Sequence, residues 1–520
     1  MPSFLQHHAA AVYGMLSGFD RVRFRGTLRR IANGDGMRTF LAYTGVLLKD
    51  FAEYVQDVTT QVKRATEAVA TAADRPLRYL AGAVEKEPLA RAIMQADGVQ
   101  AGLICTLKTV ESCWSFDIHR NRGTKQLDLV PAQRKCLHYY HYFVHPELGV
   151  MHVRLQSWFP FTVHVGLNGR EWLARQLDAA GLGYRRRENC FIWLEDVRHA
   201  QQLVDRQLRT AWPALLNGLV RQINPVHETL FAHYPLPYYW SVDQSEWATD
   251  VLFKEPAVLA GLYPALVAHG MQQLGSRDVL RFLGKRVPTV GIDPRFRGEV
   301  TSDLTARREG VRVKHRVNGN WIKMYDKQDS VLRVETVIND ARDLKVYRRK
   351  EGERRGPKQW RRLRKGIADL RRRAEISQRA NERYLAALAT VTTPGSLASV
   401  SRRVCRRVTY RGQSVRALNP LAERDAALLA AINRGEFLLN GFRNRDLRAL
   451  LYGTAADPDR QRRRQQSAAV TRQLRLLRAH GLIRKISHTN RYQLTTQGRV
   501  TIAALLAARH ADIATLTAAA

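Results

Sequence analysis

The chain has 520 residues, enough for three or four domains, and its 45% hydrophobic and 8% aromatic residues exclude an intrinsically disordered protein. Lys and Arg total 84 against 47 Asp and Glu, which gives a formal net charge of +37, and 68 of those cations are Arg. Arg offers a planar fork that suits phosphate. The charge therefore indicates nucleic acid as the partner, ahead of an anionic membrane surface.

Several classes of protein are disfavoured at once. No stretch approaches 18 apolar residues, so neither a transmembrane span nor a membrane partner is expected. The N-terminal residues lack the pattern of a secretory signal. The five cysteines are scattered without a CxxC pair, which argues against a disulfide framework and a zinc ribbon. We expect a reduced, cytoplasmic protein.

Residues 1–100 are predicted to be a mainly helical region with one strand. Residues 19–28 alternate apolar and charged side chains, the period of a half-exposed strand. Ala-rich helices are expected over about 40–72 and 88–96. Asp20 lies in the strand beside three arginines, which makes it a candidate metal ligand, although alternating charge on an exposed strand explains it equally well.

Residues 101–220 are predicted to be an α+β domain, with strands at 138–145, 150–158, 161–167 and 190–194 and helices at 171–180 and 196–219. An RNase H-like layer has this order, but such nucleases need carboxylates on the first and fourth strands, and these strands offer none. Asp20 lies too far upstream to be credited from sequence. Cys136, His138, His141 and His145 are candidate metal ligands, but alternation sends His138 and His141 to opposite faces, which favours a structural role.

Residues 221–340 are predicted to be a β-rich region with one short helix near 257–269 and a meander at 311–316, 321–327 and 331–338. The last two strands form a candidate active-site hairpin around a three-residue turn. Strand alternation puts Lys323, Tyr325, Arg333 and Glu335 on one face, with Tyr325 opposite Arg333 and Lys323 opposite Glu335.

This hairpin is the best candidate for catalysis. Tyr325 would attack phosphorus, Lys323 and Arg333 would stabilise the developing charge, and Glu335 would hold Mg²⁺ or Mn²⁺, with Asp20 as the second candidate metal ligand. The alternative is ordinary ion pairing on a solvated sheet face. The Tyr-Asp-Lys…Leu-Arg-Val-Glu string resembles a segment of rolling-circle plasmid and phage replication initiators, although the His-apolar-His motif common in those initiators is absent. No nucleotide-binding motif is present, so no nucleotide cofactor is expected.

Residues 341–393 are predicted to be a basic helical arm. Between Ala341 and Arg373 there are 15 Lys or Arg and four acids, and Trp360, Leu363, Ile367 and Leu370 follow Pro357 at helical spacing. The helix is expected to continue to about Leu388, before a linker at 394–420. The candidate nucleic-acid contacts in this arm are Arg348, Arg349, Lys350, Arg361, Arg362, Arg364 and Lys365.

Residues 421–520 are predicted to fold as helix, helix, helix, two-stranded hairpin, helix. Helices are expected at 422–433, 445–451 and 467–480, after a basic loop at 459–464, with strands at 482–486 and 491–495. The string from Thr471 to Ile483, with Tyr492-Gln493-Leu494-Thr495 and Gly498, resembles the recognition helix and wing of bacterial winged helix-turn-helix regulators. The resemblance implies DNA binding through Arg462, Arg463, Arg464, Arg472, Arg475, Arg478, Lys485 and Arg491.

The sequence thus predicts an α+β multidomain protein with a helical N-terminal region, a mixed α/β body, a basic helix and a C-terminal winged helix. We expect a DNA-binding protein of mobile-element or replication-initiator type with metal-dependent strand processing. A non-enzymatic winged-helix regulator and an RNA-binding protein that forms a ribonucleoprotein stay open as alternatives, as does a homo-oligomeric state.

Overall fold

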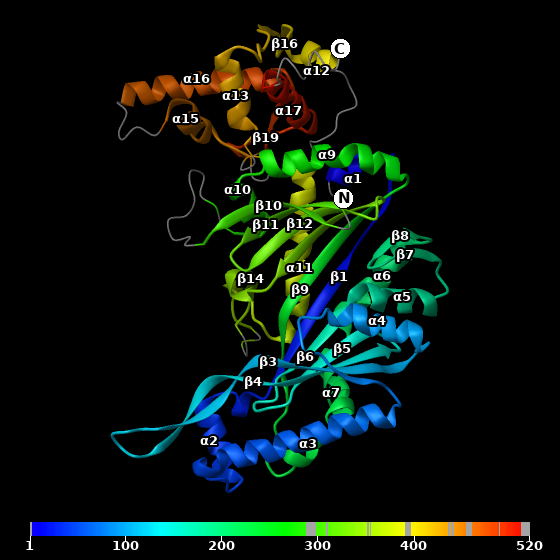
Figure 1. Ribbon diagram of the computed structural model, residues 1–520. Coiled ribbons are helices and arrows are strands. Elements are labelled where there is room, and N and C mark those ends of the chain that lie inside the picture. Colours follow the sequence, from blue (N-terminus) through cyan, green and yellow to red (C-terminus); the bar gives the residue numbers. More distant parts are fainter. Residues whose placement is uncertain are drawn as a thin grey trace. The chain divides into compact units, whose positions relative to one another are not determined.

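The computed structural model describes residues 3–285, 287, 298–307, 310–350, 353, 355–389, 397–434, 437, 441–453, 460–487 and 489–510. They form a mixed α/β fold, as predicted at that level (Figure 1). The chain divides into a first unit (Met1–Gly14, Val251–Val334 and Arg379–Ala520) and a second unit (Met15–Asp250 and Glu335–Gln378). No helix in the described part of the chain is long and apolar enough to cross a membrane.

The second unit is built on a mostly antiparallel sheet, whose strands lie in the order β13, β9, β1, β6, β5, β4, β3, β2. Strands β1, β9 and β13 continue into the first unit. The bounds are β1 (Val12–Thr27), β2 (Leu77–Tyr79), β3 (Gly102–Arg120), β4 (Leu127–His145), β5 (Gly149–Gln156), β6 (Val163–Asn168), β9 (Tyr239–Phe253) and β13 (Val331–Ile338). A separate hairpin pairs β7 (Tyr184–Arg187) with β8 (Cys190–Leu194).

Helices of the second unit pack on this sheet, with α2 beside β4 and α3 beside β3 (Figure 1). The helices are α2 (Gly34–Tyr43), α3 (Phe51–Ala72), α4 (Lys86–Ala96), α5 (Gly169–Ala179), α6 (Val197–Arg206), α7 (Trp212–Ile223), α8 (Val226–Leu230) and the first half of α11 (Leu370–Leu388). Short 3-10 helices span Arg29–Ile31, Leu48–Asp50, Gln207–Arg209, Ala341–Asp343 and Ile367–Asp369. Residues 1–100 therefore hold a central strand as well as the expected helices.

Strand β1 has the alternation that the sequence predicts over part of its length. Arg21 and Arg23 are exposed, whereas Val22 and Phe24 are buried, and the ring of Phe24 lies 5.1 Å from that of Trp212 on α7. Asp20 breaks the pattern, because it is only 4% exposed. The expected exposed charge at this position is therefore wrong, and a buried carboxylate takes its place.

The predicted basic helix is wrong over its first half. β14 (Lys345–Arg348) and β15 (Gln359–Arg362) pair as a hairpin, and α11 begins only at Leu370. The helical spacing of the apolar residues therefore does not reflect a helix. Leu363 packs in a small core with Leu344, Ile338 of β13 and Val346 of β14.

The first unit contains a four-strand meander in the order β10, β11, β12, β13. Its new strands are β10 (Val300–Arg307), β11 (Gly310–Val317) and β12 (Asn320–Lys327), and its helices near them are α1 (Ser3–His7), α9 (Pro256–Gln272) and α10 (Ser276–Phe282). Val279 and Leu280 of α10, and Leu283 directly after it, pack against Val317 of β11. The meander follows the predicted strands closely.

The C-terminal part of the first unit has a core of its own, which joins Leu428, Leu447, Leu474, Ile483 and other apolar residues. Its elements are α12 (Leu397–Val404), β16 (Val408–Tyr410), β17 (Gln413–Val415), α13 (Glu423–Ile432), α15 (Asn444–Tyr452), α16 (Arg460–Ala479), β18 (Ile483–Lys485), β19 (Tyr492–Leu494) and α17 (Thr496–His510). The predicted linker at 394–420 thus contains a helix and a hairpin, although residues 394–396 lie outside the described residues. The predicted basic loop is helical from Arg460 onward.

Candidate metal centre

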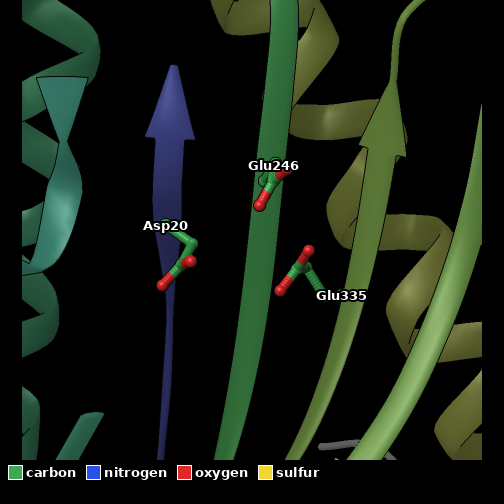
Figure 2. Close-up of side chains that lie close together, drawn as sticks. All are labelled: Asp20, Glu246 and Glu335. Atoms are coloured by element: carbon green, nitrogen blue, oxygen red, sulfur yellow. The ribbon is translucent and has the colours of Figure 1, made fainter. Parts of the chain in front are cut away.

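Three carboxylates from three neighbouring strands meet in the second unit. Asp20 lies on β1, Glu246 on β9 and Glu335 on β13, and one oxygen of each lies within 4.8 Å of the others (Figure 2). In the described residues this is the one group of three or more metal-ligating side chains. The structure therefore brings together the two predicted metal ligands, Asp20 and Glu335, and adds Glu246, which sequence reasoning missed.

Contacts between β1 and β9 explain how Asp20 meets Glu246. Ser17 Oγ donates a hydrogen bond to Thr249 Oγ1 at 3.1 Å, and Arg23 Nε lies 3.6 Å from Asp243 Oδ2. Each residue further along β1 thus lies opposite one residue earlier along β9, as in an antiparallel pair. This register puts Asp20 directly opposite Glu246, where side chains are close neighbours.

The carboxylates point away from α11. The residues that flank Glu246 contact this helix, since Trp247 Nε1 donates to Gln378 Oε1 at 2.8 Å and Arg373 Nη1 lies 3.4 Å from Ser245 Oγ. Because successive strand residues face opposite sides, Glu246 faces the other side of the sheet. Asp20 and Glu335 are 4% and 1% exposed, while Glu246 is half-buried, so the group opens toward solvent at Glu246.

Two polar side chains hold Asp20 in place. Asn189 Nδ2 donates a 2.7 Å hydrogen bond to Asp20 Oδ1. Arg170, which is 1% exposed, pairs with the buried Asp250 at 2.8 Å, and its Nε lies 3.7 Å from Asp20 Oδ1. Arg170 lies in the first turn of α5, which Asn168 caps by accepting hydrogen bonds from the backbone N–H groups of Arg170 and Glu171. The start of this helix thus places a cation beside the site.

The electrostatics of the group favour a bound cation. At an effective dielectric of about 20, two like charges at this separation repel by roughly 3 kcal/mol. The pKa of nearby Arg21 is raised: burial lowers it, but Glu87, Asp20, Glu246 and Glu335 together outweigh the burial. Oxygen ligands from carboxylates suit Mg²⁺ and Mn²⁺. The three residues therefore fit a divalent metal ion.

The other predicted catalytic residues belong to the first unit. Lys323 and Tyr325 lie on β12 and Arg333 on β13, around the expected connection at 328–330. Tyr325 is 8% exposed and Arg333 is fully buried. All residues of β13 are buried, so the expected solvated face is wrong for Arg333 and Glu335, whereas ion pairing across the hairpin stays untested. The pairing of Tyr325 with Arg333 and of Lys323 with Glu335 stays a prediction.

The Cys and His residues of β4 form no metal site among the described residues. Burial lowers the pKa of His138 to about 4 and that of His141 to about 3. His141 Nδ1 lies 3.1 Å from Thr106 Oγ1, and Cys136 Sγ lies 3.1 Å from Cys113 Sγ. These contacts join side chains that pack within the sheet, and a structural role for these residues stays a prediction.

The predicted nucleic-acid contacts fall in two places. In the second unit, Arg348, Arg349, Lys350, Arg361, Arg362, Arg364 and Lys365 lie in or beside the β14–β15 hairpin. In the first unit, Arg462, Arg463, Arg464, Arg472 and Arg475 are exposed on α16, Arg478 is half-buried there, Lys485 is exposed on β18 and Arg491 is half-buried before β19. Arg475 hydrogen-bonds Gln413 of β17, and the guanidinium of Arg478 lies 5.8 Å from the ring centroid of Tyr410. The hairpin of β16 and β17 thus contacts the C-terminal half of α16 and leaves Arg462 to Arg472 exposed.

Comparison with known proteins gives no relative for this chain. No protein-family model matches it, and no curated protein or solved structure matches significantly. The functional assignment therefore depends on the site itself.

Proposed function

We propose that the chain is a DNA-binding protein that cuts a nucleic-acid strand with divalent metal ions held by Asp20, Glu246 and Glu335. The observation that carries the proposal is the convergence of three carboxylates from three strands in a chain with a net charge of +37. An acidic cluster in a basic protein can hold a metal ion at the surface to which a polyanion such as nucleic acid binds.

The residues have separate tasks in this proposal. Mg²⁺ or Mn²⁺ bound by the three carboxylates would supply a Lewis acid for a phosphodiester oxygen and lower the pKa of water. Glu246, which is half-buried, is the ligand on the open side. Arg170 and Asn189 keep Asp20 oriented through their contacts at 3.7 and 2.7 Å. Water is our proposed nucleophile, because the side chain of Tyr325 is only 8% exposed.

We propose a winged helix for residues 421–510. The order α13, α15, α16, β18, β19, α17 and the antiparallel pairing of Ile483 with Leu494 support it. Helix α16 would be the recognition helix, and its exposed arginines in the first turns would contact phosphates or base edges. A cytoplasmic location belongs to the same proposal.

Substitution of Glu246 by Gln tests the metal site. The purified wild-type chain is expected to cleave a labelled DNA substrate in Mg²⁺ or Mn²⁺ but not in EDTA. Glu246→Gln should lower the cleavage rate at least about a hundredfold, because the metal ligand on the open side is lost. Glu228→Gln is the matched control, since Glu228 is a carboxylate in the same unit with a side chain 66% exposed. Gel electrophoresis of the products gives the rates.

The outcomes separate the candidate functions. Tyr325→Phe should keep metal-dependent cleavage, whereas its loss with a protein–DNA adduct in the wild type would favour tyrosine as the nucleophile. Equal rates for Glu246→Gln and the wild type would disprove the metal site. Specific duplex binding without any cleavage would favour the non-enzymatic regulator, and one defined RNA that co-purifies would favour the ribonucleoprotein.

A further inference from the structure

The β14–β15 hairpin has one buried face and one exposed face. Lys345 pairs with Arg362 and Tyr347 with Trp360, so these four side chains share a face of the hairpin, and all four are exposed. On the opposite face, Val346 packs against Leu344, Leu363 and Ile338. The apolar face thus fixes the hairpin to the second unit and leaves two aromatic rings exposed beside a pair of cations.

The exposed aromatic pair has no role in the core. Tyr347 is 59% exposed and Trp360 is 68% exposed, and their ring centroids lie 5.6 Å apart at an angle of 52°. Large aromatic rings at such exposure are binding surfaces more often than other exposed residues are. Flanking cations make this pair suited to a ligand with flat rings and negative charge, which is the chemistry of nucleotides.

A cationic cavity lies where the two ends of this hairpin meet the sheet. It has a volume of about 770 Å³. Five cations line it: Arg25, Arg29, Arg342, Arg364 and Lys365. Arg342 precedes β14, whereas Arg364 and Lys365 follow β15, so the cavity and the hairpin are continuous along the chain.

The charges of this cavity are uneven. Its lining has one acid, Asp243, which already contacts Arg23 at 3.6 Å and His164 at 3.4 Å. Arg342 pairs with Asp340 at 3.2 Å, and Arg364 pairs with Asp369 at 3.0 Å. These ion pairs orient the two guanidinium groups. The guanidinium of Arg29 lies 3.2 Å from the ring centroid of Tyr239. The cavity is therefore equipped for phosphate groups.

We propose that the hairpin and the cavity together bind unpaired DNA, with bases stacked on Tyr347 and Trp360 and the phosphates that follow held in the cavity. This deepens the proposed function, because it names a single strand as the substrate. Aromatic rings stack on the faces of unpaired bases, which a duplex hides between neighbouring pairs. A duplex would leave both rings without a partner.

The test measures binding in EDTA, so that no cleavage is needed. A fluorescently labelled single-stranded oligonucleotide is titrated with the full chain and followed by anisotropy. The double variant Tyr347→Ala, Trp360→Ala should bind at least about tenfold more weakly, as expected when stacking on two rings is lost. Trp114→Ala is the matched control, because Trp114 is 61% exposed on β3 of the same unit, and it should bind like the wild type.

A second pair of variants tests the cavity. Arg29→Ala with Lys365→Ala should weaken single-strand binding and reduce the slope of log affinity against log salt by about 1 to 1.5. Equal affinity of the aromatic double variant and the wild type would overturn the inference, and so would an equal loss with a duplex of the same sequence. Tighter binding of an RNA of the same sequence would show that the ligand is RNA and not DNA.

The failure of this inference can be told from that of the proposed function. If the wild type never cleaves but the aromatic double variant binds the single strand more weakly, the metal proposal alone is disproved. If the wild type cleaves and the aromatic double variant binds like the wild type, the hairpin proposal alone is disproved.

Discussion

At the scale of single residues, the carboxylates of Asp20, Glu246 and Glu335 repel one another, and a bound metal ion would offset this repulsion. Asp20 and Glu335 are almost fully buried, so water screens their charges poorly. Arg170 offsets part of this charge, but it is already paired with Asp250. A folded chain without metal is thus less stable than its packing alone would allow.

Glu335→Gln should therefore raise the melting temperature of the metal-free protein by a few degrees, since one of three repelling charges is removed. Mg²⁺ or Mn²⁺ at a hundredfold excess over the dissociation constant should increase the free energy of unfolding of the wild type by up to about 3 kcal/mol, and so raise its melting temperature. The metal should not change the melting temperature of the variant. Differential scanning fluorimetry across a metal titration measures both effects. A variant that melts lower than the wild type in EDTA would show that the carboxylates are not in repulsion.

At the scale of elements, strand β4 carries the buried histidines His138 and His141, and strand β5 carries the half-buried His152. Burial lowers the pKa of His138 to about 4, that of His141 to about 3 and that of His152 to about 4. Below a pH of about 6.5 the unfolded chain binds protons that the folded sheet does not. Stability should therefore fall as the pH drops from about 6.5 toward 4.

His141→Gln should flatten this decrease, because Gln does not titrate. Thermal unfolding from pH 7 to pH 4 measures the profile for the variant, the wild type and the control His119→Gln, a substitution of an exposed histidine on β3. The control should retain the wild-type slope. A slope for His141→Gln as steep as that of the wild type would show that His141 does not remain neutral in the fold.

The elements also show what the sequence could and could not predict. The meander from β11 to β13 and the order of elements around α16 follow from local alternation, turns and helical spacing. Strand β9 was missed, because the residues from Ala248 to Phe253 are all buried and show no alternation. Glu246 was lost with it. The basic hairpin was missed because Leu363 packs on residues distant in the chain, which helical spacing cannot reveal.

The site shows the same limit. Asp20 and Glu335 could each be named from their own strand, but only pairing between strands brings them together. The RNase H-like order of elements is predicted within residues 101–220, where the predicted strands offer no carboxylate. In the fold, β1 lies beside β6, so a strand far upstream supplies the first carboxylate.

At the scale of the whole molecule, the β14–β15 hairpin of the second unit and α16 of the first each have exposed arginines in or beside them. If α16 contacts DNA phosphates, the triple variant Arg462→Ala, Arg463→Ala, Arg464→Ala should weaken duplex binding. It should also reduce the slope of log affinity against log salt by about 2 to 3. Arg221→Ala, an exposed arginine of α7, is the control that should retain the slope. An unchanged slope in the triple variant would exclude this face of α16 from the duplex interface.

The three carboxylates also set the order in which the protein can mature. Asp20 leaves the ribosome first, and Glu335 follows 315 residues later, by subtraction of the two positions. Until β13 has been synthesised and has joined the sheet, the third ligand is missing. A nascent or prematurely terminated chain that ends before β13 therefore lacks a complete site, so the cutting activity proposed here would be withheld until β13 has been translated.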